Sequence, residues 1–230
     1  PTGLTRNLEA SGYFPKADKV IKHDGGRWMD GDTANLAIGH GEIAVTPLQM
    51  AVMTAAVANG GKLLQPRLVA AIEPQELHDE KDVIRYSAGE IRGKLNVRKE
   101  HLDLLRQAML DDVEYRDTVS NRRGTGWSAA VKGMRITGKT GTAQRMEHGR
   151  LKEYITWFVS FAPFEEPRYA IAVVVEGGDS GGTTCCPIAK AVYEAIVKRE
   201  QTTSAKHPSL VHNHDQPGKI TPAGLVERIN

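Results

Sequence analysis

The sequence predicts an α/β fold of the α+β type, in which an antiparallel sheet is flanked by helices. Two helical segments come first, three strand segments follow one another, and one more helix closes the series. Ala162 to Pro167 joins the second and third strand segments by a short turn, which is typical of an antiparallel hairpin. The alternation of strands and helices that builds a parallel sheet is missing from this stretch.

The composition is ordinary for a globular domain and narrows the classes of function. The 230 residues are 40% hydrophobic and 25% charged, and the length suits one large domain or two small ones. A net charge of +2 indicates no nucleic-acid partner. No apolar run reaches the roughly 18–20 residues that span a bilayer. The chain opens at Pro1 rather than Met, so we expect it to be a piece of a longer protein.

Two adjacent cysteines, Cys185 and Cys186, are interpreted as small buried residues. Neighbouring cysteines can pair with each other only in a strained ring. No further Cys and no nearby His completes a zinc site, and the eight His form no ligand-spaced cluster. We therefore expect no metal and no cofactor.

The first helix is predicted over residues 48–58. Thr46 is a suitable N-cap, and Pro47 suits the first helical position. The run that follows is apolar almost all round, which indicates a buried helix, and Asn59-Gly60-Gly61 ends it. The preceding residues 1–44 lack periodicity and are predicted to be an extended surface loop.

A second helix is predicted over about 98–114, with Asn96 as its cap. Its apolar residues recur at a spacing of three or four and form one packing face: Leu102, Leu105, Met109 and Val113. Residues 62–95 mix short apolar pieces with charges, so they are either short strands or an excursion on the surface.

Three strands are predicted over about 133–145, 154–161 and 169–175. In the second, Ile155, Trp157, Val159 and Phe161 share one face. The third is nearly all apolar and is predicted to be central.

A Gly-rich loop over 177–182 is followed by a helix from Pro187 to about Glu200. The predicted packing face of that helix consists of Ile188, Val192, Ala195 and Ile196. Residues 1–200 are predicted to be one structured portion, and 201–230 a polar, disordered tail.

The first strand contains a stretch that fits two motifs. Residues 133–140 match the P-loop pattern, whereas Lys139-Thr140-Gly141 matches the third motif of penicillin-binding transpeptidases and serine β-lactamases. A P-loop needs a helix directly after Lys-Thr, but Gly141 and Gly149 would interrupt it within two turns. The transpeptidase motif needs an edge strand beside a cleft, which agrees with the predicted strand.

Further segments resemble the monofunctional (class B) penicillin-binding proteins, and they occur in the family's order. The elongation-type enzymes look closest. The resemblance covers about residues 1–200. The segments that carry it are Ile38 to Met50, Ala58 to Gly61, Lys139 to Gln144, Trp157 to Pro163, Val173 to Glu176, Gly181-Gly182 and Pro187 to Ala189.

The resemblance implies a β-lactamase/transpeptidase-like fold and a peptidoglycan D,D-transpeptidase activity. In that family a serine attacks the D-Ala-D-Ala end of a stem peptide, and the acyl group passes to an amine on a neighbouring strand. The resemblance implies that Lys139 and Thr140 bind the donor carboxylate and that Gly141 keeps the strand open. Thr142 would add its hydroxyl and an oxyanion-hole N–H, and Gln144 would touch the substrate.

The resemblance also implies partners and a location. The partners are peptidoglycan stem peptides, lipid-linked precursor strands, β-lactam antibiotics, the rest of the transpeptidase domain and a membrane-embedded glycosyltransferase. The location is the periplasmic face of the bacterial inner membrane, with the anchor outside this chain.

One requirement of the family is not met by these residues. The Ser-x-x-Lys and Ser-x-Asn motifs occur nowhere in the 230 residues. We therefore expect the C-terminal part of a transpeptidase domain, which alone is inactive because it lacks the nucleophile. The alternatives are a non-catalytic scaffold module of a wall-synthesis complex, a P-loop nucleotidase and a serine β-lactamase.

Overall fold

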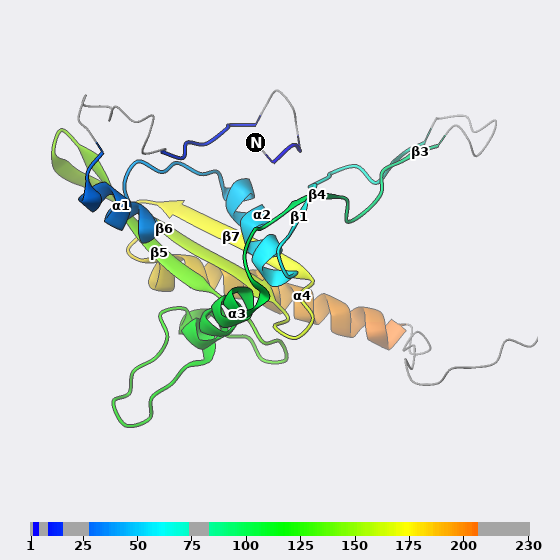
Figure 1. The fold of residues 1–230 in the computed structure, drawn as a ribbon. Helices are drawn as coiled ribbons and strands as arrows, with labels where there is room; N and C mark the ends of the chain where they lie inside the picture. The colour runs from blue at the N-terminus through cyan, green and yellow to red at the C-terminus, as the bar shows by residue number, and fades with distance from the viewer. Residues whose placement is uncertain (1, 5–8, 16–27, 74–82, 207–230) are drawn as a thin grey trace, which may run out of the picture.

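The computed structural model describes residues 2–4, 9–15, 28–73 and 83–206, and its centre is a three-stranded antiparallel sheet (Figure 1). The strands are β5 (Lys139–Glu147), β6 (Arg150–Ala162) and β7 (Tyr169–Glu176), in the order β5-β6-β7. Helix α4 (Cys186–Lys206) packs against one face of the sheet. Helix α2 (Pro47–Ala58) packs against the other face, together with part of α3 (Lys99–Glu114). The predicted fold class is confirmed.

The central strand is β6, because both other strands pair with it. The predicted hairpin is confirmed, with Ala162 opposite Tyr169 and Phe158 opposite Val173. The prediction that 169–175 is central is wrong for the described sheet, where β7 lies at an edge. Composition misled here because the side chains of β7 are half-buried on both faces without a second neighbouring strand.

Strand β6 is buried on both faces, which the single predicted apolar face did not anticipate. Phe161 packs toward α2, whereas Phe158 and Ser160 face α4. Ser160 Oγ lies 2.9 Å from the hydroxyl of Tyr193 on α4, so the two buried hydroxyls satisfy each other. Burial raises the pKa of Tyr193 to about 12.

Helix α2 begins and ends as predicted. Thr46 Oγ1 accepts from the Gln49 amide at 3.1 Å, and Gln49 Oε1 accepts from the Thr46 amide at 2.9 Å, which is a complete capping box. Asn59 is the C-cap. The last turn is buried against the sheet, in keeping with its apolar sequence.

Helix α3 matches its predicted range but not its predicted cap. The N-cap is Arg98, which makes no side-chain capping bond, rather than Asn96. Leu102, Met109 and Val113 are buried as predicted, but Leu105 is exposed and Leu110 takes its place in the core.

Strand β5 starts at Lys139, later than the predicted residue 133. Thr137 Oγ1 accepts the Phe161 amide at 3.1 Å, and the Gly138 amide donates to the Met109 carbonyl of α3 at 2.7 Å. Ile136 and Thr137 are therefore buried without belonging to the strand.

Two peripheral predictions have mixed outcomes. Within 1–44, the expected loop is interrupted by α1 (Asp30–Ala37), a short helix with no buried residue and therefore no apolar periodicity to reveal it. Segment 62–95 contains short strands, which was one of the two predicted alternatives. They pair as β1 (Lys62–Leu64) with β4 (Ile91–Lys94), and β2 (Ala71–Ile72) with β3 (Ile84–Arg85).

The face with which the last helix packs shares only Ile196 with the predicted one. Ala189 and Tyr193 are fully buried, whereas Ile188 and Val192 are 45% and 42% exposed. The helix also starts earlier, through a π-helical turn over Gly181–Cys185, and continues to Lys206. The expected disordered tail otherwise lies in 207–230, outside the described residues. Across the described chain, no helix combines the length and apolar character needed to cross a bilayer.

Candidate active site

The Lys-Thr-Gly motif lies at the start of β5, at an edge of the described sheet. Thr140, Gly141 and Thr142 stand opposite Phe158, Trp157 and Thr156 of β6. Because side chains alternate along a strand, Thr140 and Thr142 share one face, and that face is the α4 side. A strand, rather than a helix, follows Lys-Thr, so the P-loop interpretation is wrong.

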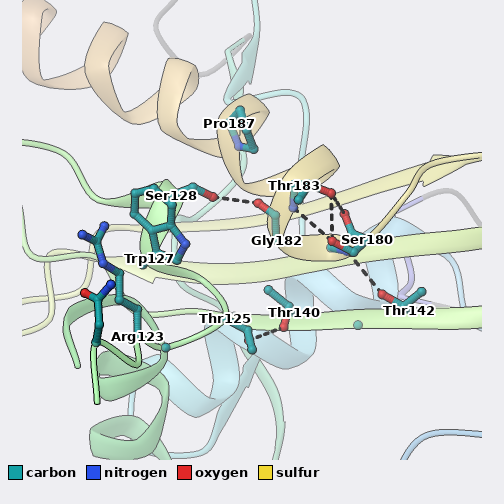
Figure 2. Close-up of a pocket in the computed structure, with 14 residues that line it drawn as sticks. Arg123, Thr125, Trp127, Ser128, Thr140, Thr142, Ser180, Gly182, Thr183 and Pro187 are labelled. Carbon is teal, nitrogen blue, oxygen red and sulfur yellow. Dashed lines mark hydrogen bonds between the residues drawn. The ribbon is translucent and has the colours of Figure 1, made fainter. Parts of the chain in front are cut away.

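Thr140 and Thr142 border a cavity of about 820 Å³ (Figure 2). Three segments far apart in the sequence form its walls. The first wall is the loop and short helix that precede β5, with Asn121, residues 123–125, Trp127 and Ser128. The second is β5 itself, with residues 140–142. The third is the turn at the start of α4, with residues 180–183 and Pro187. The prediction that the motif borders a cleft is therefore confirmed.

Two glycines in the turn at the start of α4 lie close to main-chain atoms of the sheet and of the loop around Thr125. A Cβ on Gly181 would lie 2.3 Å from the Trp157 carbonyl oxygen and 2.8 Å from that of Gly141. A Cβ on Gly182 would lie 2.6 Å from the Thr125 carbonyl oxygen. Both positions therefore require glycine, because any side chain would force the turn away from the sheet.

The hydroxyl of Thr140 belongs to a chain of hydrogen bonds. Asp112 Oδ1 accepts from Thr125 Oγ1 at 2.6 Å and from the Thr125 amide at 3.1 Å. Thr125 Oγ1 lies 2.6 Å from Thr140 Oγ1. A hydroxyl has one proton, and an ionised carboxylate only accepts. Thr125 thus donates to Asp112, and Thr140 donates to Thr125, so Thr140 presents only lone pairs to the cavity.

The hydroxyl of Thr142 is committed differently. Its Oγ1 accepts a hydrogen bond from the Gly181 amide at 3.3 Å. The proton of this hydroxyl remains available to an acceptor in the cavity. Two threonines on the same face of one strand therefore offer opposite hydrogen-bonding chemistry.

The other two predicted residues do not line the cavity. Lys139 is exposed, and its Nζ donates to the carbonyl oxygen of Thr140 at 2.7 Å. Gln144 is exposed further along β5, opposite Tyr154. The structure thus brings together Thr140, Gly141 and Thr142, and it leaves Lys139 and Gln144 on the adjoining surface.

Neither serine in the cavity wall is placed as an activated nucleophile. Ser128 Oγ donates to the Gly182 carbonyl oxygen at 2.7 Å. Ser180 caps the π-helical turn, and its Oγ accepts from the Thr183 amide at 3.2 Å. Each hydroxyl therefore stabilises the turn beside the motif.

The adjacent cysteines are buried and unpaired, as predicted. Burial raises the pKa of the Cys186 thiol to about 12. This thiol therefore stays protonated and unreactive at neutral pH.

Several wall residues were not predicted from the sequence. Thr125 and Trp127 line the cavity and Asp112 supports Thr125 from behind, but the only signal was the basic, glycine-containing loop that precedes the strand. Asp112 lies inside α3 with no motif around it. Its contact with Thr125 becomes visible only in the structure, where the loop packs on α3.

Comparison with known proteins agrees with this geometry. The family described as penicillin binding protein transpeptidase domain matches residues 2–194. An antiparallel sheet whose edge strand carries Lys-Thr-Gly beside a cavity is what this class of acyl-transfer domain would present. The chain belongs to the penicillin-binding protein transpeptidase family.

Two curated relatives illustrate the match. Peptidoglycan D,D-transpeptidase MrdA of Acinetobacter baumannii is 30% identical over 235 residues, covering 97% of this chain and 32% of that protein. Penicillin-binding protein PbpB of Mycolicibacterium smegmatis is 30% identical over 210 residues, covering 87% and 30%. The chain thus spans about a third of the length of these relatives.

Solved structures share the fold. Penicillin binding protein 3 of Mycobacterium tuberculosis, complexed with aztreonam, superposes with a TM-score of 0.69 at 28% identity, covering 87% of this chain and 43% of that one. PBP2 of Helicobacter pylori, in complex with MreC, gives 0.60 at 28% identity, covering 84% and 33%.

Proposed function

We propose that this chain is the C-terminal part of the transpeptidase domain of a peptidoglycan D,D-transpeptidase. The observation that carries the proposal is the Lys-Thr-Gly-Thr segment on an edge strand, with two threonine hydroxyls facing an open cavity. Relatives named peptidoglycan D,D-transpeptidase support it. Strand β5 would then be one wall of the acyl-transfer cleft.

The reaction needs a serine that this sequence does not supply. The serine oxygen would attack the carbonyl carbon between the two terminal D-Ala residues, and the terminal D-Ala would leave with a proton on its amine. An amine of a second stem peptide would then displace the serine and form the cross-link. β-Lactams would acylate the same serine. The role of this chain is to bind and orient the donor.

The hydroxyl geometry refines the roles expected from the motif. Thr142 has a free proton for the donor's terminal carboxylate, and its amide is the candidate oxyanion-hole donor. Lys139 would supply positive charge after its flexible stem leaves the Thr140 carbonyl. Thr140 would accept an N–H from the substrate instead of donating to the carboxylate, and Gly141 would admit the substrate backbone. Gln144 would touch substrate beyond the cavity.

The remaining partners belong to the whole protein. They are the rest of the domain with its serine, lipid-linked precursor strands and a membrane-embedded glycosyltransferase, at the periplasmic face of the inner membrane. The complex of the Helicobacter pylori relative with MreC is an example of a wall-synthesis partner for that protein.

The test begins with the reading frame that precedes the codon for Pro1. We expect Ser-x-x-Lys and Ser-x-Asn to be encoded there, and we expect the full polypeptide to bind fluorescent penicillin covalently. Lys139→Ala should slow labelling about 100-fold, whereas Lys152→Ala at the far end of the hairpin should not. Absence of the serine motif upstream would overturn the enzyme and favour the scaffold alternative. Rapid hydrolysis of the label would favour a β-lactamase.

The two threonines give a finer test. Thr142→Val should slow labelling more than Thr140→Val, because only the Thr142 hydroxyl has a proton that is free for a ligand. Asp112→Ala should release the Thr125 hydroxyl to donate to Thr140, and the Thr140 proton then becomes free for the substrate. Adding Asp112→Ala to Thr142→Val should therefore raise the labelling rate. Asp111→Ala, the neighbouring substitution on α3, is the matched control. Equal losses at Thr140 and Thr142 would contradict the assignment.

A further inference from the structure

The cavity beside β5 extends well past the Lys-Thr-Gly motif. Its far wall holds Trp127, which is 50% exposed, and Arg123, whose guanidinium carbon lies 4.6 Å from the centre of the Trp127 ring (Figure 2). A half-exposed Trp in a cavity wall leaves a large apolar surface for a ligand to cover. Neither residue has a role in the proposed reaction.

Arg123 differs from the other arginines that lie over aromatic rings. Arg106 also donates to the Phe164 carbonyl oxygen at 2.9 Å, and Arg168 lies 2.6 Å from Glu200. Arg135 is held by Glu114 and Glu165 at 2.8 and 2.7 Å. Within residues 2–4, 9–15, 28–73 and 83–206, the Arg123 guanidinium has no hydrogen bond or ion pair, so its N–H donors are available.

The surroundings of Arg123 favour an anion. No Asp or Glu is among the cavity's lining residues. Asp112 Oδ1 accepts from Thr125 and Asp179 accepts from Thr183 Oγ1, and neither carboxylate forms an ion pair with Arg123. The turn over Gly181–Cys185 directs the N-terminal end of α4 toward the same space, which adds positive potential.

We propose that Arg123 and Trp127 form a second anion subsite, which takes a carboxylate carried by the substrate peptide away from its reacting end. The proposal rests on the proposed function. The planar fork of arginine matches a carboxylate with two parallel hydrogen bonds, and stacking on Trp127 holds that fork in place. The exposed ring surface packs against the apolar part of the same peptide. Thr142 and Arg123 would then bind two different carboxylates of the same donor peptide.

The experiment uses the full polypeptide that carries this chain, labelled with 5-fluorotryptophan. The fluorine resonance of Trp127 is identified by its loss in Trp127→Phe. Three probes are titrated: a soluble stem pentapeptide with all carboxylates free, the same peptide with every carboxylate except the C-terminal one amidated, and inorganic pyrophosphate. The last arm represents a lipid-linked precursor's phosphates.

We expect the acidic peptide to shift the Trp127 resonance, and we expect amidation to weaken its binding about tenfold or more. Arg123→Gln should weaken the binding of the acidic peptide by a similar factor and leave the affinity for the amidated peptide unchanged. The affinity of Arg123→Lys for the acidic peptide should lie between those of the unaltered protein and Arg123→Gln, because lysine retains the charge without the planar fork. Arg122→Gln, one residue away and outside the lining, should match the unaltered protein.

Three results would overturn the proposal. They are equal binding of the acidic and amidated peptides, an unchanged affinity in Arg123→Gln, and a Trp127 shift with pyrophosphate alone. Penicillin labelling of the unaltered polypeptide is measured in parallel. Failure of labelling would count against the proposed function, whereas the difference between the two peptides is measured without acylation and tests the subsite by itself.

Discussion

The inner and outer faces of α4 are both apolar, yet only the inner face is packed. On the inner face, Ala189 and Tyr193 are fully buried against Phe158 of the sheet. On the outer face, Ile188 and Val192 remain nearly half exposed, in a groove that continues along the helix past Ala195. The more apolar face is the less covered one.

This difference shows what apolar spacing can and cannot predict. Spacing correctly predicts a helix, but it ranks faces by hydrophobicity, and Ile188 with Val192 outranks Ala189 with Tyr193. The inner face is selected by fit instead. A small residue lets the helix approach the sheet, and the Tyr193 hydroxyl meets Ser160. Replacing residues on each face measures how unequal they are.

The largest effect is expected at the inner face, from Phe158→Ala. The Phe158 ring is fully buried in the cluster with Tyr193 and Ala189. Removing it leaves a cavity, so the free energy of unfolding should fall by about 3–5 kcal/mol. Urea denaturation of the purified chain measures it, with Phe14→Ala on the exposed N-terminal segment as the control. A loss below about 1 kcal/mol would mean that this core is not tightly packed.

Alkaline pH should weaken the inner face next. Burial raises the pKa of Cys186 and of Tyr193 to about 12, above the unfolded values of about 8.5 and 10. The unfolded chain therefore releases these protons first as the pH rises. Their stabilisation is complete below about pH 8.5, and it falls by about 1.4 kcal/mol per pH unit for each group between its unfolded and its folded pKa.

Urea denaturation between pH 8 and 10.5 tests this, and Cys186→Ala should make the decline shallower. Lys190→Ala, on the exposed part of the same helix, serves as control. An identical pH dependence in Cys186→Ala and the unaltered chain would contradict the assignment.

A smaller loss is expected from Tyr193→Phe. The substitution keeps the ring but leaves the buried Ser160 hydroxyl without its partner, which should cost about 1–2 kcal/mol. The double variant with Ser160→Ala should recover much of that loss, because no polar atom is then left unpaired. Thermal denaturation of the three variants measures the coupling. Additive losses would show that the two hydroxyls do not interact.

The smallest effect is expected on the outer face. Ile188→Gln and Val192→Gln each replace a half-exposed side chain with a good helix former, so stability should change by less than about 1 kcal/mol. Urea denaturation of this chain measures it. A loss above about 2 kcal/mol would show that the outer face is covered in solution.

Much of the fold follows from local patterns, and the departures have physical causes. The capping box at Thr46 and the apolar run after it predict α2 closely. The start of β5 was predicted too early, because Thr137 and Gly138 are buried by tertiary hydrogen bonds that no local pattern encodes. Helix α1 escaped prediction because it buries nothing.

The candidate site was predictable only in part. Lys-Thr-Gly is contiguous, so the sequence indicates the strand and the wall it forms. The opposing walls come from the loop around Thr125 and from the turn near Ser180, which are distant in sequence and meet only after α3 and α4 pack on the sheet. The direction of the Thr140 hydroxyl depends on Asp112 inside α3, and no spacing rule links those two residues.

The glycines at 181 and 182 have one more consequence. A Cβ at either position would meet main-chain oxygens, and backbone has no rotamers through which it could yield. A substitution of one wall side chain changes the cavity locally, whereas a single methyl group at either glycine would push the turn away from the sheet and reshape the cavity for every ligand at once. The placement of the turn therefore depends on two positions that contribute no side chain of their own.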